Sequence, residues 1–188
     1  MGSDSEQAIK AQFRDAGRAA RSRATPTARA AAQTRLWAVL RDVEGCTIAG
    51  FLPLPGELDP TRAMRAWRHR NTICAPVVTA RGAPLRFREW WPGCPTRPSS
   101  FGVEEPTEGG WRVPDILVVP LLAFDAGCGR VGYGGGYYDR TLAGLPNART
   151  IGLAVEAQRV VQVPRSATDV DLDAVVTEAG LHLRPGRR

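Results

Sequence analysis

An apolar run that leads straight into a glycine-rich loop is the feature that most constrains how this chain folds. Residues 116–124 carry no charged side chain, and six glycines follow within residues 127–136. A continuous apolar run bounded by turn residues is typical of a strand buried on both faces, as in a parallel sheet. A helical pattern over residues 137–145 comes next, so the order is that of an α/β protein.

The rest of the chain continues this alternation. Two helices are predicted within residues 5–43, and a third over 59–70 with Asp59 as its N-cap. Residues 91–112, rich in Pro, Gly, Ser and Glu, predict a long loop. The predicted strands cover residues 47–52, 72–78, 85–90, 115–124, 150–155 and 174–177.

Length and element order together predict the architecture. The 188 residues suggest a single domain over 1–188, large enough to bury a core. Alternating strands and helices predict a three-layer α/β/α sandwich, Rossmann-like, with a mostly parallel central sheet. Residues 180–188, which end in Arg-Pro-Gly-Arg-Arg, are predicted to form a flexible tail.

Composition favours a cytoplasmic protein with anionic partners. The net charge is +6, which suits polyanions or phosphorylated and carboxylate-rich small molecules. No recognised nucleic-acid module is present, so we expect no nucleic-acid partner. The first forty residues lack the apolar segment of a signal peptide, and no apolar run approaches membrane-spanning length. The four cysteines show no C-x-x-C spacing and are predicted to be free thiols: Cys46, Cys74, Cys94 and Cys128.

The glycine-rich loop has the residue types of a phosphate site. Glycines let backbone N–H groups approach a ligand closely, and the N-terminus of the following helix adds donors and a partial positive charge. Arg130 lies within the loop and can fork onto a phosphate. Asp139 lies in the first turn of the helix, where a carboxylate beside phosphates most simply binds Mg²⁺.

A dinucleotide site is the alternative for the same loop. Residues 127–132 match G-x-G-x-x-G after a strand, and Glu156 follows the next strand, where a ribose-binding acid is expected. This predicts a nicotinamide-dependent oxidoreductase. Against it, the helix starts near Gly136 rather than at Gly132, and little chain remains for a full dinucleotide-binding half. No Walker A sequence is present either.

A set of motifs in a shared order resembles the 5-formyltetrahydrofolate cyclo-ligase family, also called 5,10-methenyltetrahydrofolate synthetases. The most specific is Arg-Val-Gly-Tyr-Gly-Gly-Gly-Tyr-Tyr-Asp-Arg over residues 130–140. The weaker matches are Val119–Asp125, Lys10–Arg14, Phe51–Glu57, Phe101–Pro106, Ile151–Ala154, Val163–Pro164 and Thr168–Asp173. The resemblance implies a fold like that of NagB, RpiA and CoA transferases.

The resemblance also implies a reaction. ATP would phosphorylate the formyl oxygen of 5-formyltetrahydrofolate, N10 would attack the activated carbon, and phosphate would leave, giving 5,10-methenyltetrahydrofolate and ADP. Such phosphoryl transfer depends on positioning and charge neutralisation rather than on a protein nucleophile. Mg²⁺ would be the cofactor and ATP the co-substrate. The partners would be small molecules, ATP and a reduced folate that can be polyglutamylated, and a monomer is expected rather than an oligomer.

The resemblance assigns roles to particular residues of this sequence. Arg130 and Tyr138 would be catalytic, and Asp139 with Asp169 would bind the metal, although Asp171 and Asp173 compete with Asp169. The residues that would bind ATP are Lys10, Arg14, Arg130, Gly132, Gly134, Gly135, Gly136, Tyr137 and Tyr138. The residues that would bind the folate are Leu52, Glu57, Tyr133, Gly134, Gly136 and Tyr137.

Three further expectations concern the substrate. Glu57 would hydrogen-bond the donor-rich edge of the pterin. Trp90 and Trp91, with the tyrosines of the loop, are candidates to stack on the flat rings, and surplus arginines would attract the anionic glutamate tail. One departure from the family pattern is Gly135, because some relatives carry a lysine inside the glycine run. Arg130 or Lys10 would have to steady the phosphate in its place.

Overall fold

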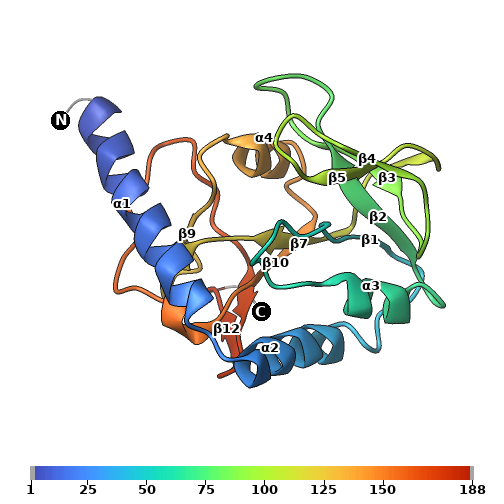
Figure 1. The fold of residues 1–188 in the computed structure, drawn as a ribbon, viewed down its shortest axis with the longest axis horizontal. Helices are drawn as coiled ribbons and strands as arrows, with labels where there is room; N and C mark the ends of the chain where they lie inside the picture. The colour runs from blue at the N-terminus through green and yellow to red at the C-terminus, as the bar shows by residue number, and fades with distance from the viewer. Residues whose placement is uncertain (1–2, 187–188) are drawn as a thin grey trace.

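The computed structural model describes residues 3–186 and is built on an eight-stranded sheet (Figure 1). The strand order is β12-β11-β10-β7-β1-β2-β3-β6. The five strands from β11 to β2 run parallel, whereas β3, β6 and β12 pair antiparallel at the two edges. The strands are β1 (Thr47–Ala49), β2 (Thr72–Val77), β3 (Arg86–Glu89), β6 (Trp111–Arg112), β7 (Ile116–Pro120), β10 (Arg149–Leu153), β11 (Ala174–Val176) and β12 (Leu181–Leu183).

Helices cover both faces of the sheet, so the predicted three-layer α/β fold is confirmed. Helices α2 (Pro26–Val39) and α3 (Thr61–Trp67) lie on one face, and α4 (Tyr137–Ala143) lies on the other (Figure 1). Strand β7 shows how both faces of the sheet are buried. Val118 packs in the cluster that contains α2 and α3, and its neighbours Leu117 and Val119 pack in the cluster that contains α4. A strand with alternate side chains in two cores must be apolar throughout, as its sequence is.

Helix α1 (Ser3–Ser22) lies beside the sheet, against β8 (Ala123–Phe124), β9 (Arg130–Val131) and the 3-10 turn η1 (Glu156–Gln158). Gly17 allows this close approach. A Cβ atom added there would lie 2.0 Å from the backbone oxygen of Leu122, a distance that no side chain tolerates. Thr25 is the N-cap of α2, and its side-chain hydroxyl accepts a hydrogen bond from the amide of Ala28 at 3.1 Å.

Several predicted elements differ from the structure in extent. The apolar run breaks after Pro120, and β8 turns away from the main sheet to form a hairpin with β9. The long loop over 91–112 contains β4 (Thr96–Pro98) and β5 (Glu104–Pro106), which form a separate hairpin, and also β6. Helix α3 begins at Thr61, whose amide is bound by the Asp59 carboxylate at 2.8 Å.

The C-terminal segment differs most clearly from its prediction. Residues 180–188 were predicted to be flexible, but Leu181–Leu183 form β12 on the edge of the sheet. Oε2 of Glu156 accepts a hydrogen bond from Nε2 of His182 in this strand at 2.8 Å, and the His182 ring packs against Phe124. Residues 187 and 188 lie outside the described residues.

Candidate active site

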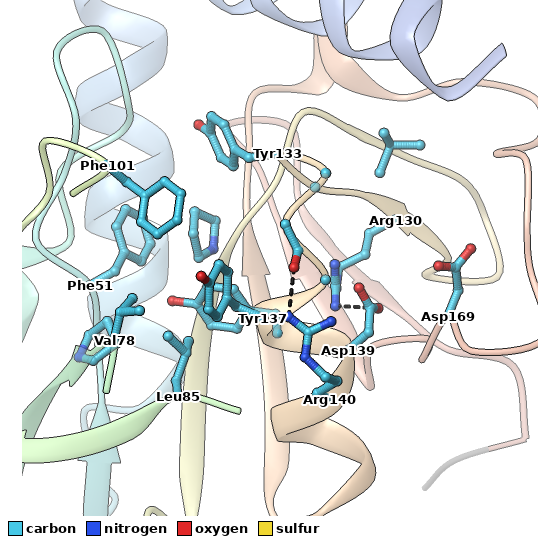
Figure 2. A pocket seen from close by; sticks show the side chains of 18 of the residues that line it. Phe51, Val78, Leu85, Phe101, Arg130, Tyr133, Tyr137, Asp139, Arg140 and Asp169 are labelled. Carbon is cyan, nitrogen blue, oxygen red and sulfur yellow. Dashed lines mark hydrogen bonds and ion pairs between the residues drawn. The ribbon is translucent and has the colours of Figure 1, made fainter. Parts of the chain in front are cut away.

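A cavity of about 930 Å³ opens between α1, the glycine-rich loop and the carboxyl ends of the parallel strands. Figure 2 shows side chains of the glycine-rich loop and of the strand ends pointing into it, and Lys10 and Arg14 of α1 also line it. Phe51 and Leu52 follow β1, Val78 follows β2, and Pro120 ends β7. Ligands of open parallel sheets bind outside the carboxyl ends of strands, so this is the expected place for a site.

The glycine-rich loop forms one wall of the cavity. Two of its glycines have positive φ angles, which leave the backbone accessible from the cavity. Gly134 and Gly136 have φ values of 97° and 64°, a region that L-residues rarely occupy. Gly136 is the N-cap of α4. Arg130 is 7% exposed, and its Nη2 donates to Asp139 Oδ1 at 2.8 Å (Figure 2). Nε of Arg130 is buried and has no hydrogen-bond partner among the described residues.

Helix α1 supplies a second group of cations to the cavity. Lys10 is 8% exposed, and its Nζ donates to Asp169 Oδ2 at 2.6 Å and to Ser166 Oγ at 3.1 Å. Arg14, one turn later, donates through Nε to the backbone oxygen of Gly132 at 3.3 Å. Both cations are therefore directed from α1 toward the loop, four residues apart on one helical face.

The pair of Lys10 and Asp169 is held in its charged form. Burial alone would lower the pKa of Lys10, but its hydrogen bonds with Asp169 and Glu6 outweigh that effect and raise the pKa. Burial alone would raise the pKa of Asp169, but the Lys10 ammonium and the Ser166 amide lower it overall. A stable ion pair here keeps positive charge beside the glycine-rich loop.

The three competing aspartates of residues 169–173 have different positions. Asp169 lines the cavity beside Lys10. Asp171 pairs with Arg165 at 3.1 Å, and Asp173 accepts the amide of Thr150 through Oδ2 at 2.8 Å, inside the sheet. Of the three, only Asp169 faces the cavity.

The opposite end of the cavity is organised around Glu57. One carboxylate oxygen accepts the Leu54 amide at 2.7 Å, and the other accepts the hydroxyl of Tyr133. Arg21 donates to the same hydroxyl at 2.6 Å and lies 3.8 Å from the carboxylate. Burial and the Glu57 carboxylate raise the pKa of Tyr133, so its hydroxyl stays protonated and donates.

Arg29 of α2 supports this end of the cavity from behind. Its guanidinium donates to the backbone oxygens of Gly56, Glu57 and Arg21, at 2.9 to 3.3 Å. It therefore ties the Glu57 loop to the end of α1. Sequence reasoning missed Arg21 and Arg29, because both act through contacts with residues distant in the chain and neither lies in a motif.

Every residue assigned to ATP, folate or metal from the sequence lines this one cavity. The set is Lys10, Arg14, Leu52, Glu57, Arg130, Gly132, Tyr133, Gly134, Gly135, Gly136, Tyr137, Tyr138, Asp139 and Asp169. Phe101, at the tip of the β4–β5 hairpin, was missed. Its ring meets that of Tyr137 edge-on, with centroids 5.4 Å apart. The stacking role expected of Trp90 and Trp91 is wrong, because neither side chain is among those that line the cavity and both pack in the core.

The alternative dinucleotide site is also wrong. Residues 127–132 lie in the β8–β9 hairpin rather than between a strand and a helix. The amides of Gly127 and Gly129 already donate to Asp125 Oδ1, at 2.9 and 3.1 Å. Glu156, the expected ribose-binding acid, is bound by Thr177 and His182. Neither the amides nor the carboxylate is available to a dinucleotide.

Two features are absent from residues 3–186. No helix there combines the length and apolar character needed to cross a bilayer. That part of the chain also holds no group of three or more His, Cys, Asp or Glu side chains placed to bind a metal. Any metal in the cavity would therefore have to take its remaining ligands from water or from a bound phosphate.

The cavity lies at the carboxyl edge of a parallel sheet, has a glycine-rich wall and is lined by cations. These features define the class of α/β enzymes that bind nucleotides. The chain belongs to the 5-formyltetrahydrofolate cyclo-ligase family, whose model matches residues 3–178. The cyclo-ligase of Escherichia coli K12 is 34% identical over 155 residues, covering 78% of this chain and 85% of that protein. The cyclo-ligase of Haemophilus influenzae is 34% identical over 134 residues, covering 66% and 72%.

Solved structures agree with this assignment. The Aquifex aeolicus 5,10-methenyltetrahydrofolate synthetase superposes with a TM-score of 0.78 at 25% identity, covering 96% of this chain and 95% of that one. The Mycoplasma pneumoniae synthetase has a TM-score of 0.70 at 20% identity, covering 90% and 98%, and so supports the fold. The chain is accordingly an enzyme of a ligase family that uses ATP and a folate.

Proposed function

We propose that this chain cyclises 5-formyltetrahydrofolate to 5,10-methenyltetrahydrofolate, with ATP converted to ADP and phosphate. The single observation that carries the proposal is the distribution of charged side chains along the cavity. Cations from α1 and Arg130 gather at the glycine-rich wall, and the Glu57 carboxylate, which is 3.8 Å from Arg21, lies at the other end. A triphosphate and a donor-rich pterin are the two ligands that this polarity separates.

The nucleotide would lie against the glycine-rich loop. Amides between residues 132 and 138 and the N-terminus of α4 would face the phosphates, because the left-handed glycines leave the backbone uncovered. Lys10 and Arg14 would approach from α1. The Arg130 guanidinium, which lines the cavity, would lie beside the transferred phosphoryl group, where it neutralises charge.

A magnesium site fits the two carboxylates that line this end. Oδ1 of Asp139 accepts from Arg130, and Oδ2 of Asp169 accepts from Lys10 and Ser166. Within residues 3–186, the second oxygen of either carboxylate accepts no hydrogen bond. One or two carboxylates are what Mg²⁺ takes when phosphates and water complete its shell. Bound there, Mg²⁺ would neutralise phosphate charge.

The folate would enter with its pterin toward Glu57. The Glu57 carboxylate would accept from the pterin's N–H groups, and Tyr133 with Arg21 would hold it in place. Leu52, Phe51 and Tyr137 would pack on the flat rings. This leaves the formyl group near the middle of the cavity, between the two ends.

The chemistry then needs positioning more than a protein nucleophile. The formyl oxygen would attack the γ-phosphorus and displace ADP. N10 would add to the resulting electrophilic carbon, its proton would leave, and phosphate would depart with the former formyl oxygen. Burial raises the pKa of Tyr138, so this residue would remain a neutral hydrogen-bond donor throughout and can orient the leaving phosphate.

The experiment is a direct assay with purified protein, 5-formyltetrahydrofolate, ATP and Mg²⁺. The methenyl product is followed by its absorbance, and ADP is quantified in parallel. We expect product and ADP in a one-to-one ratio, with no product when ATP is omitted. ADP release without a methenyl product would mean that the acceptor is a different compound.

Two finer points complete the proposal. We expect the enzyme to act as a monomer, because a single chain supplies every residue of the cavity described above. Size-exclusion chromatography with light scattering measures this. We also expect a cytoplasmic location, consistent with four cysteines that form no disulfide in the described structure.

A further inference from the structure

Arg140 ends the motif over residues 130–140, but the resemblance assigns it no role. It lies on α4 directly after Asp139, and its side chain lines the cavity. Its Nη2 donates to the backbone oxygen of Gly135 at 2.7 Å (Figure 2). Its guanidinium also lies over the Tyr137 ring, with Cζ 5.2 Å from the ring centroid. Two contacts therefore hold this side chain of α4 against the glycine-rich loop.

Arg140 has no counter-ion, unlike the two cations that were expected to compensate for Gly135. Lys10 pairs with Asp169 at 2.6 Å, and Arg130 pairs with Asp139 at 2.8 Å. In the part of the chain that the structure describes, no carboxylate oxygen lies within 4.0 Å of the Arg140 guanidinium. A cation without a partner attracts an incoming phosphate in full, whereas the field of a paired cation is partly cancelled by its carboxylate.

Arg14 is a second cation of this kind, and the two arginines lie against two different glycines of the loop. A Cβ atom added at Gly134 would lie 3.1 Å from Cζ of Arg14, and one added at Gly136 would lie 2.6 Å from Nη1 of Arg140. One guanidinium comes from α1 and the other from α4. The absence of side chains at these two glycines therefore leaves room for two cations beside the loop.

The position of Tyr137 explains how a cation from α4 can serve this loop. Residues 132–136 carry no charged side chain. A Cβ atom added at Gly135 would lie 2.8 Å from the Tyr137 ring, so the ring occupies the space into which a side chain at that position would project. Arg140 lies over the same ring. The positive charge that the glycine run itself lacks is therefore supplied from the following helix.

We propose that Arg140 binds the phosphates of the nucleotide together with Arg14, an assignment that rests on the proposed function. A guanidinium has five N–H donors in a planar fork, which binds phosphate oxygens in pairs. Within the described residues only Nη2 of Arg140 donates a hydrogen bond, and it donates to a neutral backbone oxygen. A phosphate therefore reaches Arg140 without breaking an ion pair.

The test measures the Kd of a non-hydrolysable ATP analogue with Mg²⁺ by isothermal titration calorimetry. It compares wild type, Arg140→Gln and Arg149→Gln. Arg140 is exposed, so its replacement leaves the core intact, and Arg149 is an exposed arginine at the start of β10 that does not line the cavity. We expect the Kd to rise about tenfold in Arg140→Gln, the effect of one charged contact, and to stay at the wild-type value in Arg149→Gln. An unaltered Kd in Arg140→Gln, or an equal rise in Arg149→Gln, would overturn the proposal.

Inorganic tripolyphosphate separates a phosphate contact from a change in the shape of the loop. This probe has the charge of the triphosphate without adenine or ribose, and it is titrated into the same proteins. We expect the same loss of affinity in Arg140→Gln, with the Kd for 5-formyltetrahydrofolate within about a factor of two of wild type. Unaltered tripolyphosphate binding beside weaker binding of the analogue would show that Arg140 only shapes the loop, and would contradict the proposal.

Both titrations are independent of turnover. Weaker tripolyphosphate binding in Arg140→Gln supports the role of Arg140 even if the chain cyclises no folate, in which case only the proposed function fails. A wild-type chain that cyclises the folate, with unaltered affinities in Arg140→Gln, would remove Arg140 from the site and leave the proposed function intact.

Discussion

Lys10 and Asp169 lie 159 positions apart in the sequence and form an ion pair of 2.6 Å between Nζ and Oδ2. This contact joins α1 to the loop before β11 across the mouth of the cavity. It places a buried cation beside the glycine-rich wall, and it selects Asp169 from three nearby aspartates. Several consequences of the proposed site can be measured.

Replacing Lys10 with Met should weaken ATP binding. The change removes a buried cation from the phosphate end and leaves Asp169 without its partner. We expect the KM for ATP to rise about tenfold or more, since one charged contact is worth on the order of 1.4 kcal/mol. Steady-state kinetics with ATP varied at saturating folate measure it. Arg18→Gln is the matched control, because Arg18 also lies on α1 but pairs at the surface with Asp15. An unaltered KM in Lys10→Met would remove Lys10 from the site.

Replacing Glu57 with Gln should affect the folate and spare the nucleotide. The amide keeps the size of the side chain but puts a donor where pterin N–H groups would need an acceptor. We expect the KM for 5-formyltetrahydrofolate to rise about tenfold to a hundredfold, with the KM for ATP within a factor of two. The exposed residue Glu108 supplies the control Glu108→Gln. Equal losses for both substrates would show a general disturbance of the cavity instead.

Gly17→Ala should destabilise the docking of α1. The added methyl would lie 2.0 Å from the Leu122 backbone oxygen, so the helix has to shift. Overpacking of this kind costs about 1–3 kcal/mol, which lowers Tm by about 5 °C in a chain of this size. Gly180→Ala is the control, because nothing lies within 4 Å of a Cβ there. Differential scanning calorimetry compares the two. Equal Tm values for both variants would mean that α1 is not closely packed.

Glu156→Gln should lower the free energy of unfolding at neutral pH, and this difference from wild type should shrink in acid. Burial alone would raise the pKa of Glu156, but hydrogen bonds from Thr177 and His182 lower it overall. A carboxylate with a lowered folded pKa stabilises the fold above its unfolded pKa, about 4.3, and loses that contribution as pH falls through the folded value.

Urea unfolding at pH 7, 5 and 3 measures this dependence. We expect the free energy of unfolding of wild type to exceed that of Glu156→Gln by about 1–2 kcal/mol at pH 7, because the hydrogen bonds from Thr177 and His182 lose their charged acceptor. The difference should narrow at pH 3. A difference that is constant with pH would show that the charge of Glu156 plays no part in attaching β12.

Local patterns predicted the parts of this molecule that depend on local physics. The apolar run at β7 indicated a strand buried on both faces, and Val118 and Val119 do pack into different cores. The break after Pro120 was not predictable, because Leu121 and Leu122 are as apolar as the strand before them. Only the pairing of β8 with β9, a tertiary contact, ends the strand there.

The site likewise contains residues that the sequence indicates and residues that only the structure reveals. The glycine-rich loop was visible because its composition is costly unless its backbone shape is needed. Arg21 and Arg29 were invisible, because their importance comes from contacts with Tyr133 and with the Glu57 loop that no sequence spacing reveals. Asp169 was distinguishable from Asp171 and Asp173 only through its contact with Lys10.

Amide hydrogen exchange in the presence of a non-hydrolysable ATP analogue and Mg²⁺ locates the bound nucleotide. In the proposed complex the triphosphate lies against the backbone amides of residues 132–138, with Lys10 and Arg14 opposite. We therefore expect slower exchange for those amides and for the first half of α1, and little change in β4 and β5. Protection elsewhere, with exchange of residues 132–138 unaltered, would show that the nucleotide does not bind at the glycine-rich loop.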